Sequence, residues 1–166
     1  MRKKLLSPPV MALCGLAIGA IARMLDIYTQ NLGEIFSQMA VWILLGALIS
    51  VYSSSPKRAA VNVLLFCLGM LATYYAAAAI THGVYSRSFI IGWTVFALCT
   101  PVMAALVWHA NEPGWPGRAI AAGVVAAAAL SSVVLFGGFR IYDALIDGAL
   151  IDLLFFKKVR RGARSS

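Results

Sequence analysis

The chain alternates between long apolar runs and short polar segments. The apolar runs cover residues 9–27, 34–53, 60–80, 88–108, 119–137 and 140–156. A helix of about 20 apolar residues crosses the ~30 Å hydrocarbon layer of a bilayer. Short segments with helix breakers, such as "SSSPKR" and "NEPGWPGR", connect the runs. We therefore expect an all-α integral membrane protein in which residues 1–166 form one domain, a bundle of six transmembrane helices.

Composition agrees with a membrane location and changes the meaning of the charge. Of the 166 residues, 61% are hydrophobic and only 12% are charged, whereas soluble domains carry about 25% charged residues. The net charge of +8 arises from short basic clusters next to apolar runs, where Lys and Arg determine topology. We therefore expect the lipid bilayer of the cell membrane to surround the protein, and we expect no nucleic-acid partner.

The distribution of Lys and Arg predicts how the bundle is oriented, because basic residues are enriched on the cytoplasmic side. If six helices cross and both termini are cytoplasmic, the clusters at 2–4, 57–58 and 157–164 lie inside together with Arg118. Only Arg23, Arg87 and Arg140 then lie outside. A chain with five spans would place the basic C-terminal cluster outside. The pattern therefore favours six spans, although the last run contains acidic residues.

Two polar segments place Arg and Asp near the predicted outer surface. "RMLD" at 23–26 and "RIYD" at 140–143 put these residues three apart, on one helix face where they can pair. Glu34 flanks the loop that follows the first segment. Two interpretations stay open. Either each Asp neutralises its Arg, which stabilises a helix by about 0.2–0.5 kcal/mol, or the segments line an outward-facing polar pocket.

Asp147 lies deeper in the last predicted helix than the other outer acids. Its place between the start of that helix and Lys157 is close to the middle of the bilayer. Insertion of Asp at that depth costs about 2.5–3.5 kcal/mol, so Asp147 should face the bundle interior, either paired or protonated. Asp143 lies one turn before Asp147 and forms one acidic stripe with it. Asp152 lies on another face, and its simplest partner is Lys157 or Arg160.

Aromatic and small residues provide further candidates. Tyr74, Tyr75 and Trp93 fall in the outer half of the third and fourth predicted helices. Such side chains suit the wall of a mostly apolar ligand pocket, although ordinary packing is the favoured explanation for each of them taken singly. Gly15 and Gly19 in "GLAIG" form a GxxxG pair, which permits close approach of another helix. We expect these two glycines to contact a partner protein.

Catalytic and metal-binding motifs are missing from the sequence. It contains no GxSxG with a matching His, no HExxH, no P-loop and no CxxC. Cys14, Cys67 and Cys99 lie in separate apolar runs, as expected of small buried hydrophobic residues. We therefore expect a protein that is not an enzyme and that carries no cofactor and no metal.

The layout of six short spans, a small-residue first helix and a polar outer end resembles the S components of energy-coupling factor transporters, which are their substrate-binding membrane subunits. It also resembles small six-span bacterial membrane proteins of unknown function. The first resemblance implies that the protein binds a small molecule from outside, while a partner ATPase module supplies energy. The residues expected to bind the ligand are Arg23, Asp26, Glu34, Tyr74, Tyr75, Trp93, Arg140, Asp143 and Asp147.

Two other functions stay open. The protein is alternatively a non-catalytic accessory subunit of a larger membrane complex, in which Asp147 pairs with a basic residue of another protein. In the second alternative, Asp147 titrates and the protein is a carrier coupled to protons or other cations. The sequence contains no clear inverted repeat of the kind that many carriers have, which makes this last hypothesis the weakest of the three.

Overall fold

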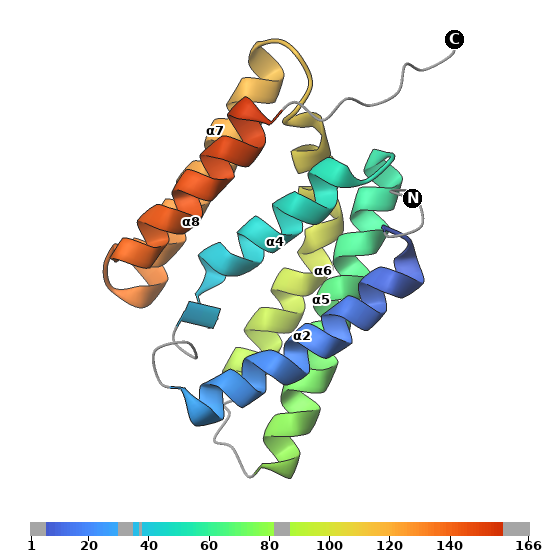
Figure 1. Cartoon of the computed structure of the whole chain (residues 1–166), viewed down its shortest axis with the longest axis vertical. Helices are drawn as coiled ribbons and strands as arrows, with labels where there is room; N and C mark the ends of the chain where they lie inside the picture. The colour runs from blue at the N-terminus through green and yellow to red at the C-terminus, as the bar shows by residue number, and fades with distance from the viewer. Residues whose placement is uncertain (1–5, 30–34, 37, 82–86, 158–166) are drawn as a thin grey trace.

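The computed structural model describes residues 6–29, 35–36, 38–81 and 87–157, and it confirms the all-α prediction for these residues. The elements are α2 (Pro8–Tyr28), α4 (Met39–Tyr52), α5 (Pro56–Ile80), α6 (Arg87–His109), α7 (Trp115–Phe136), α8 (Ile141–Ile151) and the π-helix η1 (Asp152–Phe156) (Figure 1). No strand occurs in the described part of the chain. Glu34 and His82 lie outside the described residues.

Proline, serine and glycine determine where several helices begin and end. Pro56 opens α5, where the missing N–H of proline has no cost, and the Ser55 hydroxyl accepts a hydrogen bond from the Arg58 backbone N–H at 3.2 Å. Gly137 ends α7 with φ of 73°, a left-handed conformation that glycine adopts without strain. The polar connections therefore act as the helix breakers that the sequence indicates.

Four of the helices are long and apolar enough to cross a membrane: α2, α5, α6 and α7. The other two predicted spans are shorter than expected. In place of the run 34–53, α4 has 14 residues, which rise only about 21 Å. In place of the run 140–156, α8 has 11 residues and η1 adds 5, for a rise of about 24 Å. Length and composition therefore give four candidate membrane spans among the described residues.

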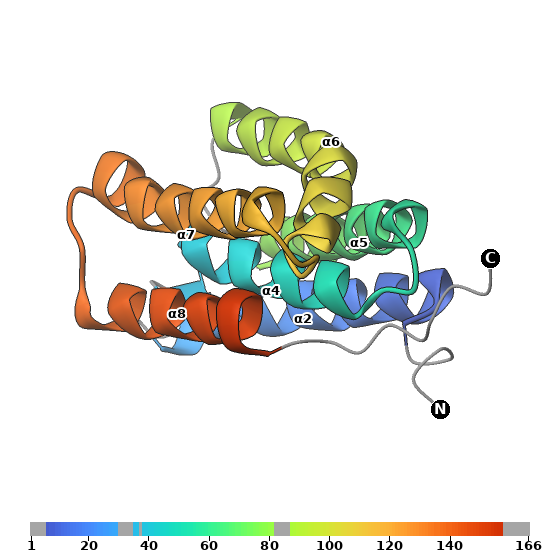
Figure 2. The ribbon, with the colours of Figure 1, turned by 90° about the horizontal axis from the view of Figure 1, so that it is seen from above.

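The helices form two groups with α4 between them. α2, α5 and α6 pack around one hydrophobic cluster that includes Phe66, Met70 and Trp108. α7, α8 and η1 pack around a second cluster that includes Ala128, Leu150 and Leu153. α4 contacts helices of both groups, and α6 also touches α7 (Figures 1 and 2). The space between the groups is therefore bounded by α4, α6 and α7.

The seam between α2 and α5 is a close backbone contact between two helices. A Cβ atom at Gly15 would overlap the carbonyl oxygen of Phe66, and one at Gly19 would overlap that of Met70. The Thr73 hydroxyl crosses this seam and donates to the Leu16 carbonyl at 2.8 Å. The prediction that these two glycines contact a partner protein is therefore wrong, because α5 of the same chain covers them.

Candidate functional site

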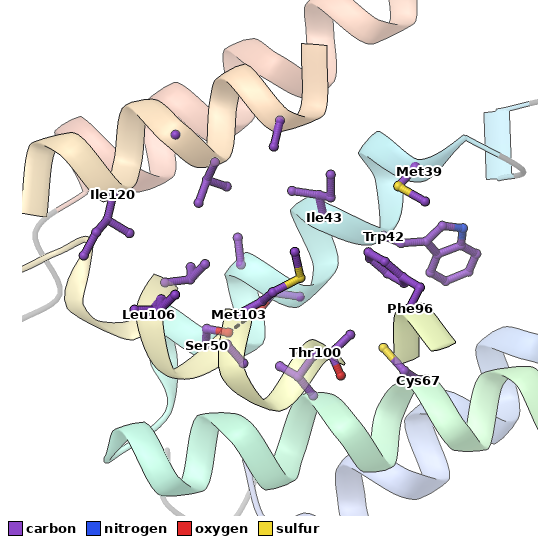
Figure 3. A pocket seen from close by; sticks show the side chains of 18 residues that line it. Met39, Trp42, Ile43, Ser50, Cys67, Phe96, Thr100, Met103, Leu106 and Ile120 are labelled. Atoms are coloured by element: carbon purple, nitrogen blue, oxygen red, sulfur yellow. Dashed lines mark hydrogen bonds between the residues drawn. The ribbon is translucent and has the colours of Figure 1, made fainter. Parts of the chain in front are cut away.

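A cavity of about 410 Å³ lies between α4, α5, α6 and α7 (Figure 3). Its wall is almost entirely apolar, with Trp42 and Ile43 from α4, Met103 and Leu106 from α6, and Ile120 from α7. Pockets for small molecules occupy about 300–1,000 Å³ and are lined mainly by such side chains. By size and lining, this cavity suits one small, mainly apolar molecule.

The two hydroxyl side chains in the cavity wall are already satisfied by their own helices. The Ser50 hydroxyl donates to the Gly46 carbonyl at 2.7 Å. The Thr100 hydroxyl donates to the Ala97 carbonyl at 2.6 Å. Each hydroxyl oxygen keeps the capacity to accept a bond, but neither hydroxyl hydrogen is available to a ligand. The cavity therefore selects for apolar surface, with at most a donor group directed at Ser50 or Thr100.

Thr100 also explains how α6 tolerates Pro101 in its interior. Proline lacks an N–H and so cannot donate to the carbonyl four residues earlier, which belongs to Ala97. The Thr100 hydroxyl takes over that bond. Figure 2 shows that α6 bends along its length, as a helix does at proline. Because Thr100 and Met103 line the cavity, the bend forms part of its wall.

The cavity opens on the outer surface of the bundle. Met103 and Leu106 line it, yet 49% and 54% of their surfaces are exposed. Both are apolar and belong to a helix that can cross a membrane. The cavity is therefore open on an apolar face of α6.

The first predicted polar segment forms a tie between α2 and α5. Arg23 and Asp26 make an ion pair at 2.6 Å, which confirms the pairing predicted from their spacing. The Tyr74 hydroxyl donates to the same Asp26 carboxylate at 3.1 Å. The Arg23 guanidinium also donates to the Thr81 hydroxyl, at 3.1 and 3.2 Å. No pattern in the sequence indicates Thr81, because only the fold brings it next to α2.

The aromatic candidates lie against the first hydrophobic cluster rather than in the cavity. Tyr74 and Tyr75 make an edge-to-face ring contact with centroids 5.4 Å apart. Trp93 makes a similar contact with Phe96 at 5.9 Å, and Phe96 itself lines the cavity. Tyr75 and Trp93 are partly buried against that cluster. Trp93 therefore reaches the cavity indirectly, through the ring of Phe96.

The second predicted polar segment lies between α7 and α8. Asp143 is 1% exposed, and its two oxygens accept bonds from the Ser132 hydroxyl and the Arg140 backbone N–H, both at 2.9 Å. Asp147 is 8% exposed, and its Oδ1 has no hydrogen-bond partner in the described part of the chain. Asp143 and Asp147 thus form the predicted buried stripe. The Arg140 guanidinium contacts the Tyr142 hydroxyl.

The third acid of this segment behaves differently. Asp152 is exposed and pairs with Lys157 at 3.2 Å. Lys157 is one of the two partners that the sequence predicts. The predicted division of the three acids, two buried on one face and the third paired with a basic residue, is therefore confirmed.

A family model matches residues 1–164, almost the whole chain, and its description is a family of unknown function (DUF6518). The chain belongs to DUF6518. No curated protein and no solved structure matches the chain. The functional assignment for this DUF6518 protein therefore depends on its own residues.

The DUF6518 structure distributes the predicted ligand-binding residues over two helix groups. Arg23, Asp26 and Tyr74 belong to α2 and α5, whereas Asp143 and Asp147 belong to α8. None of the described members of the predicted set lines the cavity. The cavity itself was missed. The only sign of the cavity in the sequence is small residues on facing helices, such as Gly46 and Gly123. Glycines also occur where two helices touch, so they do not distinguish a cavity from a contact.

Proposed function

We propose that this DUF6518 protein is a multi-pass protein of the cell membrane that binds a small, mainly apolar molecule in the cavity between α4, α5, α6 and α7. The observation that carries the proposal is the cavity itself, about 410 Å³ in volume, apolar in its wall and open beside Met103 and Leu106. Empty apolar space of this size is costly, because the atoms of the wall lose packing contacts. A bound molecule or a lipid chain restores them.

The proposed arrangement has six helices and two cytoplasmic termini, with α4 and α8–η1 as short members. Short apolar helices are accommodated by local thinning of the bilayer or by flanking residues that reach the interface. The basic clusters at 57–58 and 157–164 support this orientation. The predicted partner, an ATPase module, is compatible with this role, since the sequence contains no P-loop with which to use ATP itself.

The alternative function is an accessory subunit in which Asp147 pairs with a basic residue of another protein. The burial of Asp147 weighs against this alternative. The side chain is 8% exposed within its own chain, so a basic residue of a partner has little access to it. A binding role is therefore the better supported of these two functions. In that role the protein binds the molecule, and a partner drives its movement.

The experiment that tests the binding role compares the purified protein with variants that fill the cavity. Gly46 and Gly123 line it, and a Cβ at either position meets no atom closer than 3.8 Å. Gly46→Leu and Gly123→Leu therefore insert a side chain without a backbone clash. Gly92→Leu is the matched control, because Gly92 lies on α6 outside the cavity and its Cβ meets nothing within 4 Å.

The measurement is mass spectrometry of organic extracts from each purified variant. The wild type and Gly92→Leu should carry the same apolar molecule in stoichiometric amount, and both cavity variants should lose it. Identification of the mass separates a lipid from a free metabolite. Equal amounts in all four proteins, or no bound molecule in the wild type, would contradict the proposal.

A further inference from the structure

Asp143 and Asp147 are neighbours on α8 whose surroundings differ sharply. Both oxygens of Asp143 accept hydrogen bonds, from Ser132 and from the Arg140 N–H. Donors to both oxygens favour the ionised carboxylate. Asp143 also lies in the first turn of α8, where the helix dipole stabilises negative charge. Asp143 is therefore the member of the pair whose two oxygens both have donors.

Asp147 lacks each of these supports. It lies one turn further along α8, beyond the reach of the dipole at the helix start, and it is 8% exposed. Its buried Oδ1 has no hydrogen-bond partner among the residues that the structure describes. The charge that acts on it is the negative charge of Asp143. A second carboxylate charge at this place would be both desolvated and repelled.

The helices packed against α8 offer Asp147 no counter-charge. Between Met39 and Tyr52, α4 contains no Asp, Glu, Lys, Arg or His, and its one titratable group is Tyr52 at its last position. In α7 the only charged residue is Arg118, in the first turn. Ser132, the contact of Asp143, lies 14 residues later, about 21 Å along the helix. In η1, Asp152 is occupied by Lys157.

A buried acceptor oxygen without a donor, such as Oδ1 of Asp147, indicates that a hydrogen is missing beside it. A protonated carboxyl supplies one, because it carries an O–H donor.

We propose that Asp147 is a one-proton site on α8, in which its side chain carries a proton next to the carboxylate of Asp143. The step is the binding of one proton by the Asp147 carboxylate, which gives a neutral carboxylic acid. A proton is favoured over a metal ion because Asp143 already uses both oxygens. Moreover, no group of three or more His, Cys, Asp or Glu side chains suited to a metal occurs among the described residues.

This site is independent of the proposed ligand, since neither aspartate nor Ser132 lines the cavity. It also accounts for acids in a helix that is otherwise apolar. With Asp147 neutral and Asp143 enclosed by donors, α8 buries its two acids at a lower cost than two free charges would impose.

The test is infrared spectroscopy of the full-length protein in lipid nanodiscs, with aspartate labelled by ¹³C at the side-chain carboxyl. The chain has only four aspartates: Asp26, Asp143, Asp147 and Asp152. Asp26 and Asp152 are in ion pairs. The wild type should show the isotope-shifted carbonyl band of a protonated carboxyl at neutral pH. Absence of that band from the wild type would overturn the proposal, even if no variant folds.

Variants assign the band to one residue. Asp147→Asn should abolish it completely, and the matched control Asp152→Asn should leave it unchanged. Asp143→Asn should retain the band. When the pH is raised, the band of this variant should disappear at a lower pH than the band of the wild type, because a repelling charge has been removed. Three outcomes would refute the assignment. The band persists in Asp147→Asn, or it is absent from Asp143→Asn at all pH values, or it is lost when sodium chloride is added to the wild type.

Discussion

The seam between α2 and α5 and the cavity between α4 and α7 both contain glycines in apolar helices, with opposite results. At Gly15 and Gly19 the missing side chain lets the backbone of α5 come into contact. At Gly46 the nearest atom to a Cβ is 3.8 Å away, and at Gly123 there is none within 4 Å. The first pair closes a helix contact, whereas the second pair leaves room. A glycine in a membrane helix therefore shows only that volume is absent, and the neighbouring helix decides whether that volume is filled.

The neighbours explain the difference. In the seam, α5 presents Phe66, Met70 and the Thr73 hydroxyl to the glycine face of α2, so backbone atoms and a hydrogen bond fill the space. In the cavity, α6 is bent at Pro101, which keeps its second half from packing as one straight rod against α4 and α7. The variants below distinguish the two regions, from the largest expected effect on stability to the smallest.

Gly15→Leu should destabilise the protein by about 3 kcal/mol or more. The introduced leucine overlaps the backbone of Phe66, and a clash with backbone atoms cannot be relieved by a change of rotamer. Thermal unfolding in detergent, followed by circular dichroism, measures the effect. Gly92→Leu introduces the same residue at an open position and serves as the control. A Gly15→Leu protein that unfolds at the same temperature as this control would show that the seam is not a close contact.

Thr100→Val should destabilise α6 by about 1–2 kcal/mol, since the Ala97 carbonyl then loses the donor that replaces the proline N–H. The partner variant Pro101→Ala restores a backbone donor. The double variant Thr100→Val with Pro101→Ala should therefore lose less than Thr100→Val alone. A double-mutant cycle of unfolding free energies tests this coupling, and additive effects would contradict it.

Tyr74→Phe should cost about 0.5–1 kcal/mol, because it removes one hydrogen bond to a partly exposed carboxylate at the end of the seam. The ring and its contact with Tyr75 remain. Equilibrium unfolding measures the loss. An effect as large as that of Gly15→Leu would mean that the polar tie, rather than the glycine contact, holds α2 against α5.

Gly123→Leu should have the smallest effect on stability and the opposite sign. Leucine has a higher helix propensity than glycine by up to about 1 kcal/mol, and the position has open space. The same unfolding assay, carried out on delipidated proteins so that loss of a bound molecule does not contribute, should show a slightly more stable protein. A destabilised Gly123→Leu protein would show that the cavity is narrower than the structure indicates.

Sequence reasoning succeeded where the answer depends on local helix geometry. The spacing of Arg23 and Asp26, the common face of Asp143 and Asp147, and the reach of Lys157 to Asp152 all follow from helical periodicity. It overestimated the length of α4, which starts at Met39, because hydropathy measures how apolar a run is and not whether the run is helical.

Contacts between helices could not be predicted in this way. Ser132 reaches Asp143 across a turn, and Thr81 reaches Arg23 from another helix. Serine and threonine are common in membrane helices and usually bond to their own backbone, so neither residue stands out in the sequence. The cavity was missed for the same reason. Its existence depends on how α4, α6 and α7 fit together, and glycine positions alone do not specify that fit.

The central claim, that the cavity is a binding site for an apolar molecule, is tested most directly by photocrosslinking in nanodiscs with a fatty acid that carries a diazirine at the end of its chain. We predict that peptide mapping locates crosslinks on Trp42, Met103 and the Ile120–Ala127 segment. We also predict that Gly123→Leu removes these crosslinks while Gly92→Leu retains them. Crosslinks confined to lipid-facing residues such as Leu98 and Val102, with the same yield in both variants, would contradict the claim.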